Sequence, residues 1–474
     1  MMGIASSALA IGGVDKAPAP SAPHQATFTK PKEAKLENGL RVIVAERPGL
    51  PLLAAELLVR SGSEIDPPDR AGTASMTGTL LTKGTEKMSA PEIAAAIESL
   101  GGSISSGASW DSSTAVVAVM SDKAEPALAI LADVVLHPTF KAEEIDRLKK
   151  QALDGLQVAM QQPGALAGLA RPRILFGQSG YGHQSGGTIE SVQAIQRDDV
   201  LKVYHQSFRP DNAALILVGD VTLEKGRAFA QKFFGEWKAE GGAQGISAPS
   251  VAGEKGWKPV NLVIDMPQAG QAAVSVCKPA IKRSSPDFYA GIVANAALGN
   301  GFASRLNREI RIKRGLSYGA RSALEPRRDT GPFVASAQTK NESAAEVAKL
   351  MEGELKRLAS EPVQGDELKS RQAMLTGNYA RTMETNQGVA GEIAGLAVYE
   401  LPIDTLDKFV SSINAVSAAD ATAFSKKYFA EPGSVVIAGK APAFIEALKK
   451  DLPDVKVIEQ SELDLNRPDL TKAR

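Results

Sequence analysis

The side chains best suited to bind a catalytic metal are few and widely spaced in this chain of 474 residues. The histidines are His24, His137, His183 and His205, and the single cysteine is Cys277. Two zinc ligands on one helical face stand four residues apart, as in His-x-x-x-His, and a glutamate three after the first can act on the metal-bound water. No two of these histidines lie within a helical turn of each other, so we interpret each as a surface or capping residue. The lone cysteine excludes an internal disulfide framework and leaves the redox compartment open.

Composition and charge are those of an ordinary globular protein. Apolar residues make up 43%, and Lys plus Arg equals Asp plus Glu at 54 each, so no net charge attracts nucleic acid or an anionic membrane. A chain of this length is too long to fold around one hydrophobic core, which indicates two to four domains. No apolar run approaches the roughly 18 residues of a membrane span. No glycine-rich phosphate loop follows a strand, which argues against nucleotide binding.

The N-terminal residues allow two interpretations. The weakly apolar run Met1–Gly13 is followed by the Ala/Pro-rich Ala17–Pro23, and the first lysine is Lys16. A secretory signal begins with positive charge and has a longer apolar core. We interpret residues 1–30 as the remnant of an export signal with a disordered linker, which favours a periplasmic or otherwise exported protein. The alternative is the flexible tail of a cytoplasmic protein.

Strands and helices follow one another in an order typical of an α+β layer fold. Residues 40–46 and 52–59 have strand composition, and residues 103–110 and 113–119 are expected to pair in a sheet. Ser89, with a glutamate three residues later, has capping-box spacing and begins a helix between these pairs. The order of strands, helix, strands and helices favours α+β over a Rossmann fold.

The two halves of the chain resemble each other. A helix end, an aromatic residue, a proline turn, an apolar strand and a glycine follow in that order at residues 203–219 and again at 427–439. Such repetition indicates two domains of one fold, the alternative being chance similarity of two connections. The Gly/Ala/Ser/Pro-rich segment between the halves is typical of a linker, which would let them move as a clam. The expected division is a segment at 1–30, domains at 31–239 and 257–450, a linker at 240–256 and a tail at 451–474.

Five tracts match, in order, those of a known family. They are Leu36–Val42, Arg60–Ser63, Gly72–Thr85, Tyr181–Val192 and Gly299–Tyr318. The last is the most specific, and looks like G-G-G-F-S-S-R-L…L-R-E-K-R-G-L-A-Y. From Leu36 to about Leu448 the chain therefore resembles the insulinase/pitrilysin-like zinc metallopeptidases, in particular the short bacterial subfamily that acts as two-chain assemblies. The resemblance implies two homologous domains, each a mixed, largely antiparallel sheet packed with several helices.

The tract Gly72–Thr85 keeps the frame of the family's zinc-binding helix without its ligands. In the family a sequence such as G-L-A-H-F-L-E-H-M-L-F-K-G-T carries the metal. Here Ser75, Gly78 and Thr79 stand at the His, Glu and His positions, and the third ligand, a glutamate, falls at Gly155. Hydroxyls are poor neutral zinc ligands and glycine offers no side chain. We therefore expect no metal in this chain.

The resemblance assigns two substrate-contacting residues to the second half. They are Arg311 and Tyr318, which would reach the substrate in the closed assembly. Arg311 offers permanently charged donors to a peptide carbonyl, and Tyr318 a hydroxyl near the oxygen that becomes negative in a tetrahedral intermediate. The structural alternative is an arginine on a solvated helix face and a tyrosine in a strand core. The other basic residues of the tract are expected to be solvated or salt-bridged: Arg305, Arg308, Lys313 and Arg314.

The leading hypothesis is a noncatalytic, substrate-binding subunit of a heterodimeric zinc metalloendopeptidase that degrades peptides in a closed chamber. The chain would be inactive alone, and zinc is expected in a homologous partner that keeps His-x-x-Glu-His. In related enzymes peptides bind by strand addition, for which residues 103–119 are favoured. The alternatives are a structural or assembly protein without a peptidase role, and an active peptidase with another metal site.

Overall fold

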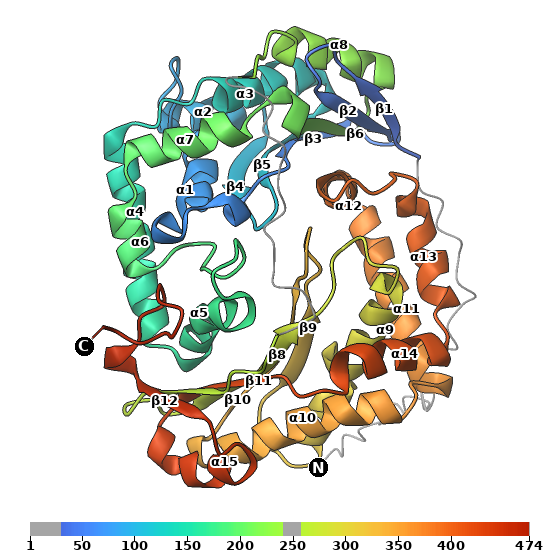
Figure 1. Ribbon diagram of the computed structural model, residues 1–474. Helices are drawn as coiled ribbons and strands as arrows, with labels where there is room; N and C mark the ends of the chain where they lie inside the picture. Colours follow the sequence, from blue (N-terminus) through green and yellow to red (C-terminus); the bar gives the residue numbers. More distant parts are fainter. Residues whose placement is uncertain (1–29, 240–256, 474) are drawn as a thin grey trace, which may run out of the picture.

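The computed structural model describes residues 30–239 and 257–473, so the predicted N-terminal segment and linker lie outside the described residues. Each half of the chain forms one six-stranded sheet (Figure 1). The strands of the first are β1 (Lys32–Lys35), β2 (Arg41–Glu46), β3 (Leu52–Val59), β4 (Ser103–Ala108), β5 (Ser113–Met120) and β6 (Ala213–Gly219). Those of the second are β7 (Leu262–Asp265), β8 (Ala272–Pro279), β9 (Ala320–Leu324), β10 (Pro332–Thr339), β11 (Ser434–Gly439) and β12 (Lys456–Glu459). The strands predicted in the first half are confirmed within about two residues.

The two sheets share one topology. Their strand orders are β1-β2-β6-β3-β5-β4 and β12-β7-β11-β8-β10-β9, so the five strands from β2 to β6 correspond to those from β7 to β11. β2 runs parallel to β6 and β7 runs parallel to β11, whereas β3 and β8 pair antiparallel with their neighbours. The predicted fold of two homologous, largely antiparallel α+β domains is confirmed.

Helices cover the outer face of each sheet. The first half contains α1 (Thr73–Leu80), α2 (Ala90–Ser99), α3 (Ala124–Leu136), α4 (Ala142–Met160), α5 (Pro163–Phe176), α6 (Ile189–Ala194), α7 (Arg197–Ser207) and α8 (Leu223–Phe234). The second contains α9 (Phe288–Gly299), α10 (Ala344–Ser360), α11 (Gly365–Met383), α12 (Asn386–Val398), α13 (Thr405–Ala415), α14 (Ala418–Phe429) and α15 (Ile445–Asp451). The predicted capping box begins α2, where the Ser89 amide donates to the Glu92 carboxylate at 2.8 Å. No helix in the described ranges has the length and apolarity to cross a bilayer.

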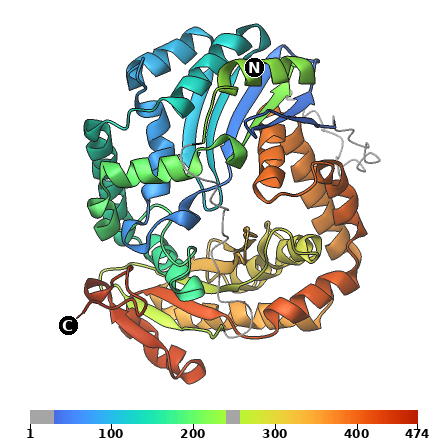
Figure 2. The same cartoon turned by 45° about the horizontal axis from the view of Figure 1, so that its top comes forward.

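One helix of each half packs on the sheet of the other half. α5 packs on β8 and β11, and α12 packs on β3 and β6. Both helices lie between the two sheets (Figures 1 and 2), and we call the sheet face turned towards them the inner face. Separating the halves would expose both apolar clusters to water, which is unfavourable in proportion to the apolar area uncovered. This packing opposes the predicted movement of the two halves about the linker.

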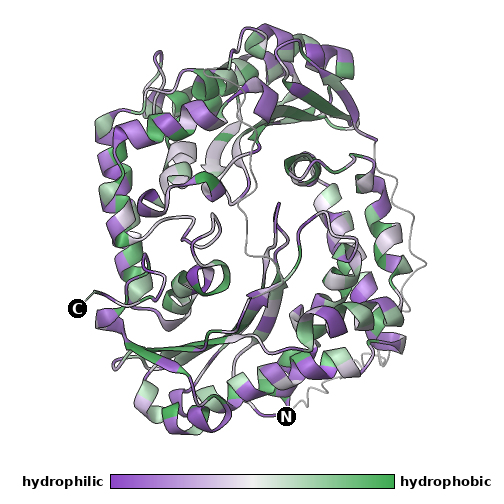
Figure 3. Ribbon diagram, in the orientation of Figure 1, coloured by the Kyte–Doolittle hydropathy of each residue, from purple (hydrophilic) through white to green (hydrophobic). Residues whose placement is uncertain are grey.

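Strand composition follows from which faces are covered. β3 and β6 read as nearly continuous apolar runs because helices cover both of their faces. β5 instead alternates buried and half-buried residues, since its inner face lies beyond the reach of α12. Figure 3 shows the corresponding pattern, with hydrophobic residues along the strands and mixed hydrophobic and hydrophilic residues around the helices.

The C-terminal residues belong to the second domain. The sequence predicted a tail from residue 451, but β12 pairs in parallel with β7 and extends the sheet. Leu463, Leu465 and Leu470 are buried beside α5. The prediction of a tail is therefore wrong. The apolar residues that follow residue 451 are too few to show a periodic pattern in the sequence, yet they pack on the inner face of the second sheet.

Glu56 interrupts the apolar run of β3 and makes stability depend on pH. It is buried between Val116 and Ile216 of the neighbouring strands, and burial raises its pKa to about 7. A raised folded-state pKa favours folding at low pH, and this contribution is lost as pH rises from about 4.5 to about 7. Between pH 4.5 and pH 8 we expect the free energy of unfolding of the wild type to fall by roughly 3 kcal/mol relative to that of Glu56→Gln, measured by denaturant unfolding. Glu37→Gln, at an exposed glutamate, is the control. If the free energies of unfolding of Glu56→Gln and the wild type differ by the same amount at every pH, the proposed role of Glu56 is wrong.

Candidate functional site

Helix α1 is fixed at its N-terminus by a buried carboxylate. Gly72 precedes the helix with φ +97°, and the Asp66 carboxylate accepts hydrogen bonds from the backbone N–H groups of Gly72 and Ala74 at 2.9 and 2.8 Å. The N–H groups at a helix start need such partners, so the frame of the helix is stabilised independently of any metal. The positive φ of Gly72 explains why the glycine before the helix is retained.

The three α1 positions where the family places zinc ligands and the glutamate carry two hydroxyls and one glycine, and the glycine is packed against a strand. The Thr79 hydroxyl donates to the backbone oxygen of Ser75 at 2.9 Å, within the helix itself. Gly78 lies directly against β4: a Cβ added there would meet the backbone carbon of Gly107 at 2.6 Å. No side chain fits at Gly78 unless α1 and β4 move apart. These donors do not fit a zinc ion, because two hydroxyls and a glycine supply neither imidazole nor carboxylate.

The fourth position, Gly155, lies on α4 with open space around its Cβ direction. α4 contacts α1, so the helix that carries Gly155 lies beside the helix that carries the other three positions. Within residues 30–239 and 257–473, no three His, Cys, Asp or Glu side chains gather as a metal site would require. Of the described histidines, His137 follows α3 and lies 3.3 Å from Asp133, as expected of a capping residue.

Gly78 and Gly155 provide a matched pair of substitutions with opposite expected effects. We expect Gly78→Ala to destabilise the fold by about 1–3 kcal/mol, because the methyl group overlaps the β4 backbone. We expect Gly155→Ala to stabilise it by up to about 1 kcal/mol, because alanine is the better helix former and its methyl group meets no atom. Chemical denaturation measures both. A Gly78→Ala variant that is as stable as the wild type or more stable would rule out the packing role of Gly78.

In the second half, the tract Gly299–Tyr318 includes a π-helical turn and a loop before β9. The turn spans Asn307–Ile312, where the Lys313 N–H donates to the Arg308 oxygen five residues back at 2.9 Å. Gly315, at φ +64°, ends it as predicted. Single π-turns inside helices occur often at functional sites. Arg305 is buried and forms a bidentate pair with Glu367 at 2.8 and 3.0 Å, which ties the turn to α11.

The turn exposes Arg311 to solvent, and the loop that follows it exposes Tyr318. Arg311 is exposed and its guanidinium lies 4.9 Å from the ring centre of Phe302, itself 63% exposed. Tyr318 is 91% exposed and makes no hydrogen bond to any residue that the structure describes. It precedes β9 rather than lying within a strand core, so the structural alternative for Tyr318 does not hold. Of the other basic residues, Lys313 and Arg314 pair with Glu309, as expected.

Tyr318 borders a cavity of about 790 Å³ on the inner face of the second sheet. We call it the Tyr318 cavity. Its walls are β8, β9, β10 and the first turn of α5, together with the Arg171 side chain. Among the described residues that line it, Arg311 does not appear, and neither does any of the four degenerate metal positions. The structure therefore keeps Tyr318 apart from α1 within a single chain.

Two cavity residues were missed from the sequence. Arg321 follows Tyr318 by three residues on β9, and Arg171 lies on α5 of the first half. The alternation of Arg321, Ala323 and Glu325 could have placed Arg321 on one face of a strand, but nothing in the sequence brings α5 to the second sheet.

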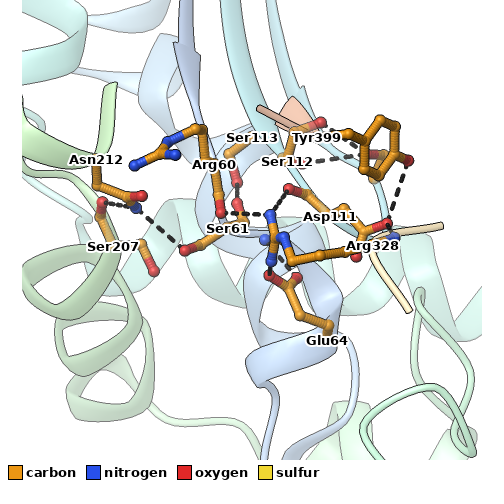
Figure 4. Close-up of polar contacts among 12 residues, drawn as sticks. Arg60, Ser61, Glu64, Asp111, Ser112, Ser113, Ser207, Asn212, Arg328 and Tyr399 are labelled. Atoms are coloured by element: carbon orange, nitrogen blue, oxygen red, sulfur yellow. Dashed lines mark hydrogen bonds and ion pairs between the residues drawn. The ribbon is translucent and has the colours of Figure 1, made fainter. Parts of the chain in front are cut away.

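A buried polar junction joins the two halves beside this cavity. Arg328, between β9 and β10, pairs with Glu64 at 2.7 Å and donates to the backbone oxygens of Arg60 and Asp111 at 2.7 and 2.9 Å (Figure 4). The Tyr399 hydroxyl donates to the Asp111 carboxylate at 3.2 Å. These contacts link four segments of the chain that are far apart in sequence. They anchor the β9–β10 loop, and with it the strand that follows Tyr318.

The preceding residue, Arg327, strengthens the same junction. Its guanidinium lies 4.2, 4.9 and 5.6 Å from the ring centres of Trp110, Tyr181 and Phe176 of the first half. A guanidinium enclosed by aromatic faces is stabilised by cation–π attraction, more so when water is excluded. His183 lies beside Trp110 and is buried, so the interpretation of this histidine as a surface or capping residue is wrong; burial lowers its pKa. The tract that contains Tyr181 and His183 is therefore part of the junction between halves.

Comparison with family models identifies both halves of the chain. Residues 41–184 match the model described as Insulinase (Peptidase family M16), and residues 194–375 match the one described as Peptidase M16 inactive domain. Among curated proteins, an uncharacterized zinc protease of Bacillus subtilis is 22% identical over 400 residues, which cover 84% of this chain and 96% of that protein. An uncharacterized zinc protease of Rickettsia bellii is 25% identical over 412 residues, covering 86% and 97% respectively.

Solved structures agree with these matches. The peptidase M16 inactive domain from Pseudomonas fluorescens superposes with a TM-score of 0.79 at 28% identity, covering 86% of this chain and 97% of that one. A protease from Helicobacter pylori superposes with a TM-score of 0.82 over 87% of this chain and 100% of that one. At 19% identity the second match shows the fold alone.

Proposed function

The chain belongs to the peptidase M16 (insulinase) family, and from this premise we propose that it is the noncatalytic, substrate-binding subunit of a two-chain zinc metallopeptidase. Its partner is a homologous chain with an intact His-x-x-Glu-His helix, which holds the zinc. The present chain supplies half of the peptide chamber together with Arg311 and Tyr318. The substrates are peptides.

The observation that carries this proposal is the contrast between α1 and Tyr318. On α1, Gly78 leaves no room for the family's glutamate, and the Thr79 hydroxyl is bonded within the helix. Tyr318 instead stands 91% exposed, with no role in the packing of its own chain. The phenol hydroxyl of Tyr318, which has no hydrogen bond among the described residues, can donate to or accept from another molecule. Two of the degenerate metal positions thus serve the packing and hydrogen bonding of α1, while Arg311 and Tyr318 remain available to another molecule.

Tyr318 and Arg311 suit complementary tasks. A phenol O–H can donate to the carbonyl oxygen of a scissile peptide bond as that oxygen becomes negative, and a donor aimed at this position acts mainly in the transition state. The guanidinium of Arg311 can hold a neighbouring peptide carbonyl with two parallel N–H groups. Neither side chain takes a proton or forms a covalent bond in this scheme. Both orient the peptide and stabilise developing charge at the partner's metal site.

The junction at Arg328 and the exchanged helices indicate where the chamber opens. Opening between the halves of this chain would break a buried ion pair and uncover two apolar clusters. Opening between the two chains breaks neither. We therefore propose that this subunit moves as one body and that peptides enter between it and its partner.

Reconstitution tests this function. The tagged chain is purified from its native cell, the co-purifying chain of similar size is isolated, and hydrolysis of a fluorogenic peptide is measured for each chain and for the mixture. We expect hydrolysis only in the mixture, saturating at equal amounts of the two chains. A partner that is fully active alone, or a stable complex with proteins that have no peptidase activity, would refute the proposal.

A further inference from the structure

Two arginines line the Tyr318 cavity without a carboxylate partner. Arg171 donates to the Ser275 hydroxyl at 3.2 Å, its only hydrogen bond among the described residues. Arg321 is exposed and forms no hydrogen bond or ion pair within the described part of the chain. Guanidinium groups in clefts are usually paired, because carboxylates and phosphates match their fixed N–H geometry. Two guanidiniums without a carboxylate partner on one cavity leave charged donors available to an anion from outside the chain.

The sheet register brings the two arginines to opposite sides of one small residue. Ser336 of β10 lies opposite Ser275 of β8 on one side and opposite Arg321 of β9 on the other. Neighbouring strands are about 4.8 Å apart, so the Cα atoms of Ser275 and Arg321 are separated by roughly 10 Å. Arg171 reaches this row through its bond to Ser275. A carboxylate placed over Ser336 would lie between the two guanidiniums and beside two hydroxyls.

The remainder of the floor is small and weakly charged. Ala273 and Ala323 leave space for a side chain to enter. Glu325 is the one carboxylate among the described lining residues, and it lies four residues along β9 from Arg321, about 13 Å away in an extended strand. Its carboxylate is 3.8 Å from Arg327, so it is engaged with the interdomain junction. The row centred on Ser336 is therefore the positively charged part of the cavity.

We propose that the Tyr318 cavity binds a carboxylate of the peptide substrate, held between Arg171 and Arg321 over Ser336. The inference rests on the proposed peptide-binding function and adds a substrate class, peptides with an acidic side chain or a free C-terminal carboxylate near the scissile bond. Tyr318 stands three residues before Arg321 at the same cavity, so an acidic group bound there is positioned a short distance from the bond that Tyr318 contacts.

Peptide binding to the purified single chain tests the proposal without a partner. Fluorescent peptides of one sequence are compared with a central Glu or Gln, each with a free or an amidated C-terminus, in chloride buffer free of phosphate and sulfate. We expect about tenfold tighter binding for whichever carboxylate the cavity takes, decreasing as salt is raised. The Glu/Gln and acid/amide pairs identify whether a side chain or the C-terminus supplies it. Equal affinities for all four peptides would overturn the proposal.

Variants locate the binding to the cavity. We expect Arg321→Gln and Arg171→Gln each to abolish most of this tenfold preference, whereas Arg227→Gln, at an exposed arginine on α8, leaves it intact. Arg321 is exposed and lacks a partner, so its variant is expected to fold even if the loss of the Arg171–Ser275 bond harms folding. A preference that survives Arg321→Gln would place the carboxylate elsewhere. A chain that binds acidic peptides but never activates a partner would refute the proposed subunit function and leave this site standing. A chain that activates a partner but shows no preference for a carboxylate would refute this site and leave the subunit function standing.

Discussion

Replacing Tyr318 with phenylalanine is expected to lower the turnover of the assembled peptidase by about 100-fold, the usual cost of removing one donor to a developing oxyanion. The change removes only the hydroxyl of a side chain that is 91% exposed in the single chain. The loss should therefore appear mainly in kcat, with little change in KM, because the donor acts in the transition state. Steady-state kinetics on the reconstituted pair measures both constants.

Arg311 gives the companion result with a different kinetic signature. Arg311→Ala is expected to raise KM as well as lower kcat, because a guanidinium that holds a peptide carbonyl acts in the ground state too. Arg308→Ala, at another exposed arginine of the same turn, is the matched control. Association of the chains, followed by size-exclusion chromatography, should be unchanged in all three variants. Normal turnover in both Tyr318→Phe and Arg311→Ala would eliminate the proposed roles.

Arg328→Ala is expected to destabilise the fold by about 3 kcal/mol at pH 8, because a buried charge loses its partner. The Glu64 side chain is fully buried, and burial raises its pKa to about 7 while the neighbouring Arg328 lowers it. Without Arg328 the carboxylate must be desolvated unpaired or take up a proton. The loss should thus be smaller at acid pH, where Glu64 is protonated. Urea unfolding at several pH values measures the change.

A double-mutant cycle separates this ion pair from the other contacts of Arg328. Glu64→Gln removes the charge that Arg328→Ala would leave unpaired, so the double variant should be more stable than the sum of the single effects indicates. The residual loss reports the bonds of Arg328 to the backbone oxygens of Arg60 and Asp111. A loss below about 1 kcal/mol in Arg328→Ala, typical of an exposed pair, would show that the junction does not hold the halves together.

The repeated fold could be predicted because its evidence is local. Alternating or continuous apolar runs with proline turns and glycines recur in both halves, and they became β6 and β11 at equivalent places in the two sheets. The absence of imidazole and carboxylate groups at Ser75, Gly78 and Thr79 was visible too, once the resemblance to the family supplied the register of the helix. The packing of Gly78 on β4 was not, because a close approach of backbones leaves no mark on the sequence beyond the glycine itself.

The parts that could not be predicted depend on contacts between the halves. The apolar residues of α5 and α12 identify buried helices but do not say which sheet they cover. Arg321 alternates with small residues on β9 and reads as an ordinary solvent-facing side chain until α5 brings Arg171 to the same cavity. The exposure of Tyr318 also required the structure, because its tract is equally compatible with a strand core.

Zinc analysis combined with an activity assay determines which chain carries the metal chemistry, since all of it is proposed to lie in the partner. The purified chain, its partner and the reconstituted pair are each loaded with zinc, freed of excess metal and analysed for zinc and for peptide hydrolysis. We expect no stoichiometric zinc and no hydrolysis in this chain, and one zinc for each pair with full activity. One tightly bound zinc in this chain, together with hydrolysis by the chain alone, would contradict the account.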